Sequence, residues 1–305
     1  MTLSFADLKK NRAASINSLN EELGKFQKKT YTDNSDKYWQ LTVDKAGNGS
    51  ATIRFLPSPE GESKPVIRFW EHSFEGPKKG DEKGQWYIEK SLTTLGQDDP
   101  VSEYNNKMWE TGLKKNQDIV RDRKRKLYYV SNIYVVKDPA NPDNDGKVFL
   151  YKYGQKIFTR INDLMNPAFD DIEKVNPFDL WEGANFKLRA TKVAGYRNYD
   201  KSDWDKPSPL LDDDAELERI WKSEESLEKV IDPSEFKTYA QLKARLDKVL
   251  RINTSDDLEA QKTAKPKMDK LNSDDNPPWT DPDGSHQDED GDDDNFFKRF
   301  EDGDE

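Results

Sequence analysis

Alternation of hydrophobic and polar residues predicts β-strands through the middle of the chain. Trp39, Leu41 and Val43 alternate with polar residues, a glycine-rich turn follows at 46–49, and apolar residues return at 51–56. This pattern predicts a β-hairpin. Similar runs, rich in β-branched and aromatic residues, predict further strands at 66–70, 85–89, 127–136, 147–153 and 184–193.

Helical spacing of apolar residues marks both ends of this β-rich body. Phe5, Leu8 and Leu23 belong to such a series, so we expect a helical arm over 1–26, followed by a polar linker at 27–36. The arm either docks on another molecule or folds back on its own domain. Further helices are expected at 155–165, 215–230 and 232–250, the last starting from Asp232 and Pro233.

Composition separates the body from an acidic tail. The 305-residue chain is 33% hydrophobic and 36% charged, which is polar for one compact globule. Residues 256–305 lack apolar periodicity and carry 18 acidic and 6 basic residues, whereas 1–255 has a net charge of +1. We therefore predict an α+β protein, mainly β with helices, that has a folded core at 38–252 and a disordered acidic tail at 256–305.

The main chemical signal is a basic stretch that leads into aromatic strands. Residues 107–126 carry 8 basic and 3 acidic residues, and the strand at 147–153 places Tyr151 and Tyr153 on one face and Lys152 on the other. Cations neutralise phosphates and rings stack on unpaired bases, so this stretch suits single-stranded DNA. The alternative is that the rings belong to a core and the cations to a solvated edge. The basic cluster consists of Arg121, Arg123, Lys124, Arg125 and Lys126.

Three smaller groups carry the same combination of rings and cations. Each lies in a polar loop or turn, where side chains reach solvent. They are Lys78, Lys79 and Trp86; Trp109, Lys114 and Lys115; and Tyr196, Arg197 and Tyr199.

The acidic tail has two expected uses. It can compete with a polyanion for a cationic groove, or it can reach partner proteins. Phe296, Phe297 and Phe300 stand in an acidic setting near its end, which suits a short docking motif recognised by partners. The other interpretation is an incidental chain end.

Other classes of protein find little support in the sequence. Cysteine is absent, so disulfides and cysteine-based metal sites are excluded, and no phosphate-binding loop motif is present. The two histidines are His72 and His286, and the densest acidic run lies in the expected tail, where metal geometry would not be held. We therefore expect that the protein is not an enzyme. The lack of a signal-like or membrane-spanning apolar stretch predicts a soluble, cytosolic protein.

Several short runs occur in order at spacings that resemble one protein family. They are AGNG (46–49), IRFLP (53–57), WYIE (86–89), VVKDP (135–139), GKVF (146–149) and WEGANF (181–186). Together they resemble the T-even-type bacteriophage single-stranded-DNA-binding proteins, the helix-destabilising proteins of the phage replisome. The resemblance covers roughly 38–250.

This resemblance implies an OB-fold core, a basic DNA groove, a self-associating N-terminal segment, and an acidic C-terminal region that contacts replication and recombination proteins. The self-association residues would be Lys9, Lys10, Arg12 and Ser15. The groove would contain Lys124, Arg125 and Lys126. The stacking candidates would be Trp86, Tyr129, Tyr151, Tyr153, Tyr196 and Tyr199.

One departure from the family concerns a structural zinc. The family's type member holds zinc through one His and three Cys; His72 matches the His, but Ser91, Asp99 and Ser102 stand at the Cys positions. Hydroxyls and a carboxylate do not replace thiolates in a tetrahedral structural zinc site, so we expect no zinc and no other cofactor. An inserted subdomain at about 72–105 would then be held by packing, through Trp70, Phe74, Tyr87 and Tyr104.

The expected function is cooperative, sequence-independent binding of single-stranded DNA in phage DNA replication, recombination and repair, in the cytoplasm of the infected bacterial host. Two alternatives stay open. One is a protein-interaction hub that recruits replication proteins through its tail, and the other is a binder of single-stranded RNA.

Overall fold

A computed structural model describes residues 35–78, 80, 82–169 and 171–252. The predictions for the arm at 1–26, the tail at 256–305 and Lys79 lie outside these residues. The chain separates into two units, 1–37 and 38–305. Of the first unit, the described part is a 3₁₀ turn, η1 (Ser35–Lys37). All elements below belong to the second unit.

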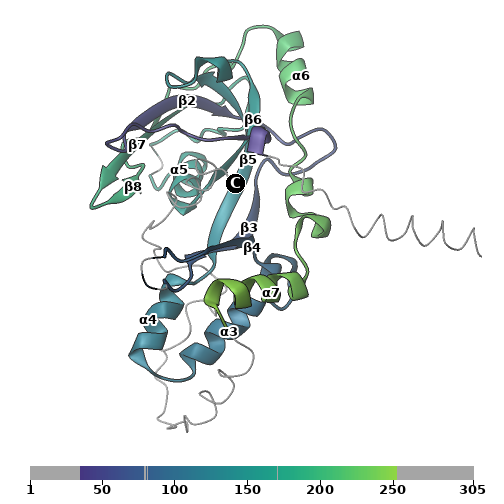
Figure 1. The fold of residues 1–305 in the computed structure, drawn as a ribbon. Helices are drawn as coiled ribbons and strands as arrows, with labels where there is room; N and C mark the ends of the chain where they lie inside the picture. The colour runs from purple at the N-terminus through teal and green to yellow at the C-terminus, as the bar shows by residue number, and fades with distance from the viewer. Residues whose placement is uncertain (1–34, 79, 81, 170, 253–305) are drawn as a thin grey trace, which may run out of the picture. The chain divides into compact units, whose positions relative to one another are not determined.

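The second unit is built on one mixed sheet (Figure 1). Its main path runs β1–β6–β5–β2–β7–β8, β3 pairs with both β5 and β4, and β9 pairs with β7. The strands are β1 (Tyr38–Trp39), β2 (Gly49–Phe55), β3 (Ile67–Glu75), β4 (Trp86–Lys90), β5 (Lys126–Lys137), β6 (Val148–Tyr153), β7 (Phe186–Val193), β8 (Tyr196–Asn198) and β9 (Asp203–Trp204).

Helices accompany the sheet, which confirms the predicted α+β class. Among the described residues, no helix has both the length and the apolar character needed to cross a membrane. The α-helices are α3 (Pro100–Trp109), α4 (Lys114–Asp122), α5 (Gln155–Met165), α6 (Asp214–Lys222) and α7 (Tyr239–Leu250). The 3₁₀ helices are η2 (Leu92–Leu95), η3 (Pro142–Asn144), η4 (Glu228–Ile231) and η5 (Pro233–Glu235).

Strand β5 connects the two halves of the sheet. Its C-terminal half pairs with β2 and its N-terminal half with β3, while β6 pairs along its middle. Side chains alternate between the two faces of a strand. Accordingly Tyr129, Ile133 and Val135 enter one hydrophobic cluster, whereas Tyr128 and Val130 enter another on the opposite face.

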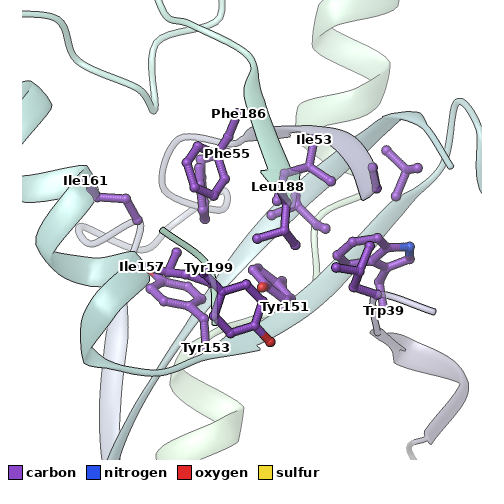
Figure 2. Close-up of a cluster of buried hydrophobic side chains, with 14 of the residues drawn as sticks. Trp39, Ile53, Phe55, Tyr151, Tyr153, Ile157, Ile161, Phe186, Leu188 and Tyr199 are labelled. Carbon is purple, nitrogen blue, oxygen red and sulfur yellow. The ribbon is translucent and has the colours of Figure 1, made fainter. Parts of the chain in front are cut away.

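The largest cluster, the first core, lies between the sheet and α5 (Figure 2). Aromatic rings contact one another edge to face within it: Trp39 and Tyr151 have centroids 5.3 Å apart, and Phe55 and Tyr153 5.7 Å apart. Such pairs add about 0.5–1.5 kcal/mol each beyond the burial of their surface. The rings therefore help to hold β1, β2 and β6 around α5.

A second core forms beyond β3, where β3 and β4 pack against α3 and α7. Phe74 and Tyr87 stack in it with centroids 5.1 Å apart, and Leu242 and Leu246 of α7 are fully buried there. Of the four aromatic residues that the sequence assigned to holding this region, Phe74 and Tyr87 lie in this core, Tyr104 packs against it, and Trp70 is not part of it.

The predicted hairpin of 39–43 and 51–56 is wrong. The turn itself closes, because the Gly47 N–H donates to the Asp44 carbonyl at 2.9 Å. However, β1 pairs in parallel with β6, and β2 lies between β5 and β7. Both edges of β2 are thus occupied by other strands, and the first core buries Ile53 and Phe55 completely.

Two predicted helices are shorter than expected. The helix expected at 215–230 ends at Lys222, because the Asn132 side chain takes both the N–H and the carbonyl of Glu225, at 3.1 and 2.8 Å. The helix expected from 232 begins only at Tyr239, where Thr238 and Gln241 form a capping box. Between these helices, the extended Phe236 fills the second core.

Arg54 on β2 is buried completely, yet its guanidinium is hydrogen-bonded. It donates to Asn185 Oδ1, the Asp179 carbonyl and the Ser208 carbonyl at 2.9, 3.1 and 2.7 Å. Burial lowers its pKa to about 10, against the effect of the neighbouring carboxylates, Asp179 and Asp205. The residue therefore ties the loop before β7 to the sheet.

We expect Arg54→Met to lower the free energy of unfolding by about 3 kcal/mol, because three acceptors lose their donor inside the protein. Urea unfolding measures this. Exposed Arg219→Met is the matched control and should change stability by less than about 0.5 kcal/mol. Equal stability of the two variants would contradict the role given to Arg54.

Glu224 provides a pH-dependent prediction. Burial and the charge of Glu62 raise its pKa from 4.5 to about 8, against the lowering effect of the Asn132 amide. A carboxyl with a raised folded-state pKa stabilises the fold below the unfolded-state pKa, and this contribution is lost as pH rises through the folded-state value. Glu224→Gln should remove the loss, giving a variant more stable than the parent by about 2 kcal/mol near pH 9.

The measurement is the urea midpoint of parent and variant across that pH range. Glu228→Gln, an exposed neighbour, is the control and should follow the parent. The two pKa values set a pH range of about 5 to 9 for this test. If the urea midpoint of the parent does not decrease as the pH is raised across that range, the result counts against the burial of Glu224.

Candidate nucleic-acid interface

One face of the β3–β5 pair is covered at both ends and exposed in the middle. Arg68 pairs with Tyr129, and Trp70 pairs with Leu127, so these four side chains share a face. Tyr129 lies in the first core, and Phe74, further along the same face of β3, lies in the second. Between them is an uncovered strip of the sheet, formed by Arg68, Trp70, Arg125 and Leu127, with Arg68 exposed and the others half-buried.

Cations and a ring meet in this uncovered strip. The guanidinium carbon of Arg125 lies 4.3 Å from the centroid of the Trp70 ring, and burial lowers the Arg125 pKa. Arg68 is close enough to Tyr129 for its charge to oppose the effect of burial, which raises the pKa of Tyr129. A flat ring with two guanidinium groups beside it can contact a base and its phosphates together.

The basic cluster divides into exposed and buried members. Arg121 is exposed, 2.7 Å from Asp118 and 5.2 Å from the Trp109 ring. Arg123 instead lies over Phe74 at 5.4 Å, beside Met108 of α3. Arg123 is half-buried with its guanidinium packed between β3 and α3, and its contact with DNA stays a prediction.

Lys124 and Lys126 are half-buried neighbours of the strip. Burial lowers the pKa of Lys124, and the charge of Lys126 lowers it further. Lys126 pairs with Glu71, so it leaves β5 on the face opposite the strip. Like charges held this close make the region attractive to phosphate, which relieves their repulsion.

Four predicted stacking residues lie in the first core, and Figure 2 shows three of them among aliphatic side chains. The tyrosine hydroxyl of Tyr153 contacts Ser131 Oγ at 2.9 Å, and burial raises the Tyr153 pKa. The Tyr129 ring stacks on Phe158 of α5 at 4.0 Å. The core alternative is thus correct for Tyr129, Tyr151, Tyr153 and Tyr199, which are 2–7% exposed.

Lys152 is a further correction. Its ammonium lies 2.9 Å from both carboxylate oxygens of Glu71 and 3.8 Å from the Tyr128 ring centroid. These contacts are on the face of the sheet opposite the strip. Lys152 is therefore part of a buried ion pair and not of a DNA surface.

The remaining candidates are spread over the molecule. Tyr196 is 56% exposed at the β7–β8 turn, with Arg197 beside it on β8. Trp86 pairs with Glu75 and so lies on the opposite face from Trp70. Trp109 is half-buried at the end of α3, whereas Lys78, Lys114 and Lys115 are exposed.

Arg68 is the functional candidate that the sequence reasoning missed. A signal was present, because alternation over 66–70 places Arg68 on the same side as Trp70. Its importance depends on the pairing of β3 with β5, which places it opposite Tyr129, on the same face as Trp70 and Leu127. No local pattern shows that pairing.

Asp99 stands at one of the family's four zinc positions, and the residues at the other three positions lie around it. Oδ1 of Asp99 accepts from the N–H groups of Val101 and Ser102, both at 3.0 Å, and lies 3.1 Å from His72 Nε2. Oδ2 accepts from Ser91 Oγ at 3.0 Å and from the Leu92 N–H at 3.2 Å. Burial would raise the pKa of Asp99, but the hydrogen bond and charge of His72, with Ser102 and Ser91, lower it to about 2.

This cluster does not fit zinc. The carboxylate oxygens already accept five hydrogen-bonding contacts, and the other available atoms are hydroxyls in place of thiolates. Across the described part of the chain, no group of three or more His, Cys, Asp or Glu side chains is placed to hold a metal.

A ring and guanidinium groups on an open part of a β-sheet, next to a basic segment, define a nucleic-acid-binding class of protein. The chain belongs to the family described as gp32 DNA binding protein like, whose model matches residues 47–250. The resemblance inferred from the short sequence runs is thereby confirmed.

Curated phage proteins are similar to the chain over most of its length. It is 37% identical to the single-stranded DNA-binding protein of Enterobacteria phage T2 and 36% identical to that of Enterobacteria phage T4, over 242 residues and 76% of each chain. A shorter match joins it to the single-stranded DNA-binding protein of Escherichia phage SV14, 42% identical over 71 residues, covering 23% of this chain and 58% of that protein.

Two tyrosines three residues apart test the distinction between core and surface rings. Tyr199→Ala should lower the free energy of unfolding by about 3 kcal/mol, because it empties a site in the first core. Tyr196→Ala, the matched control, should cost less than about 0.5 kcal/mol. Urea unfolding of both variants provides the measurement, and a small effect of Tyr199→Ala would mean that its ring is not part of the core.

Proposed function

We propose that the protein binds single-stranded DNA without sequence preference. Trp70 stacks on a base, Arg68 and Arg125 neutralise phosphates on either side, and the basic segment at 121–126 continues the path. Only unpaired strands offer free base faces, so binding favours single strands and lowers duplex stability by mass action.

The observation that carries this proposal is the Arg125–Trp70 contact in an open part of the sheet. A core ring would be covered by apolar side chains. Here the ring is half-buried with the guanidinium 4.3 Å above it, and Arg68 is exposed on the same face. The single-stranded-DNA-binding names of the phage T2 and T4 relatives support the same function.

We infer that the first core belongs to an OB-type barrel. Strands β1, β6, β5, β2 and β7 follow one another in the sheet and share the first core with α5, an arrangement that supports this fold (Figure 1). Self-association through 1–26, recruitment of replication and recombination proteins by 256–305, and action in the infected host's cytoplasm complete the proposal. The family resemblance supports these further parts of the proposal.

Removing both guanidinium groups tests the strip. Arg68→Ala with Arg125→Ala should reduce the slope of log K against log salt by about 1.4, because each lost phosphate contact on a single strand removes about 0.7 from that slope. Quenching of tryptophan fluorescence by oligo-dT at several salt concentrations gives the slope.

Lys64→Ala with Lys229→Ala is the matched control, since both lysines are exposed and outside the strip. Its slope should equal that of the parent. An unchanged slope in the Arg68 and Arg125 variant would reject the strip as the DNA site. Competition between DNA and RNA of equal length, run on the parent, tests the choice of sugar.

A further inference from the structure

Asp99 is the most heavily hydrogen-bonded buried side chain near the basic segment. Its carboxylate begins α3 by accepting from Val101 and Ser102, and it accepts from Ser91 and Leu92 at the start of η2. It therefore fixes two helical turns relative to each other. Its side chain is 1% exposed, so water does not compete for these bonds.

His72 extends this network to the basic segment. Its Nε2 contacts Asp99 Oδ1 at 3.1 Å, and its Nδ1 lies 3.3 Å from the carbonyl oxygen of Arg123. Both neighbouring oxygens are acceptors, so a ring nitrogen that carries a proton donates to the oxygen beside it. Asn105 Nδ2 donates to the same Arg123 carbonyl at 3.4 Å.

Contacts to the Arg123 carbonyl hold the backbone of the basic segment and so orient it. Arg123 follows α4 directly, its side chain packs over Phe74, and β5 begins three residues later. With both its backbone and its side chain held, the chain direction through 124–126 is set. Arg125 is then delivered over Trp70.

We propose that Asp99 and His72 are positioning residues for DNA binding: they hold the Arg123 carbonyl, and thereby the Arg125 guanidinium over Trp70, by hydrogen bonds and without a metal. This inference rests on the proposed function. Hydrogen bonds carry the task because the Asp99 carboxylate already accepts from Ser91, Leu92, Val101 and Ser102.

The test compares His72→Gln, His72→Ala and Asp99→Asn with the parent, at a temperature where urea curves show every protein folded. Loss of one or two phosphate contacts should weaken oligo-dT binding about tenfold near 0.2 M salt and reduce the salt slope by about 0.7–1.4. His72→Gln keeps one donor and should lie between His72→Ala and the parent.

Leu227→Ala is the control for lost stability, because Leu227 is fully buried in a cluster on the other face of the sheet. It should lower the urea midpoint and leave affinity and slope unchanged. If the His72 and Asp99 variants behave in the same way, their role is only structural and the proposal is overturned.

Limited trypsin digestion, done without DNA, tests whether the basic segment is held in place. Cleavage within 121–126, mapped by mass spectrometry, should accelerate in the His72 and Asp99 variants and stay at the parent rate in Leu227→Ala. A parent that binds no DNA would reject the proposed function, and the digestion would still decide whether the network holds the segment. Unchanged cleavage would overturn the positioning role.

Treatment with a chelator tests the statement that the network works without a metal. Treatment with 1,10-phenanthroline should leave the parent's urea midpoint and salt slope unchanged. A midpoint that falls with chelator and recovers with added zinc would overturn it.

Discussion

The structure depends on one strand being shared by two hydrophobic cores. β5 pairs with β2 and β6 at one end and with β3 at the other, so its register fixes both halves of the sheet. In the middle of the β3–β5 face the first core reaches Leu127, and neither core includes Trp70. Arg68 and Trp70 remain accessible there because the packing on either side stops short of them.

The same types of charged side chain serve two purposes in this protein. Arg54 and the Lys152 side chain are buried and Arg123 is half-buried; they find carbonyl, carboxylate or aromatic partners, so they hold elements together. Burying a charge is costly unless it is paired in this way. Arg68 and Arg125 stand where the cores leave the sheet open, and this location suits them to a polyanionic ligand.

Local pattern predicted the larger elements well. The strands β3 to β7, the helix α5, the basic segment and the family all follow from periodicity and short motifs. It failed where the outcome depended on distant partners. The hairpin was wrong because β6 takes β1, and two helices were shortened because Asn132 and the Thr238 capping box compete for the backbone.

The sequence by itself determined the α+β class, the family and the location of the basic segment, because periodicity, motif order and charge are properties of neighbouring residues. Tertiary structure decided which rings and cations are available. Tyr151 and Trp70 both belong to aromatic strands with nearby cations, yet one is in a core and the other in the uncovered strip. That difference arises from which elements cover each sheet face, and such contacts join residues far apart in the chain.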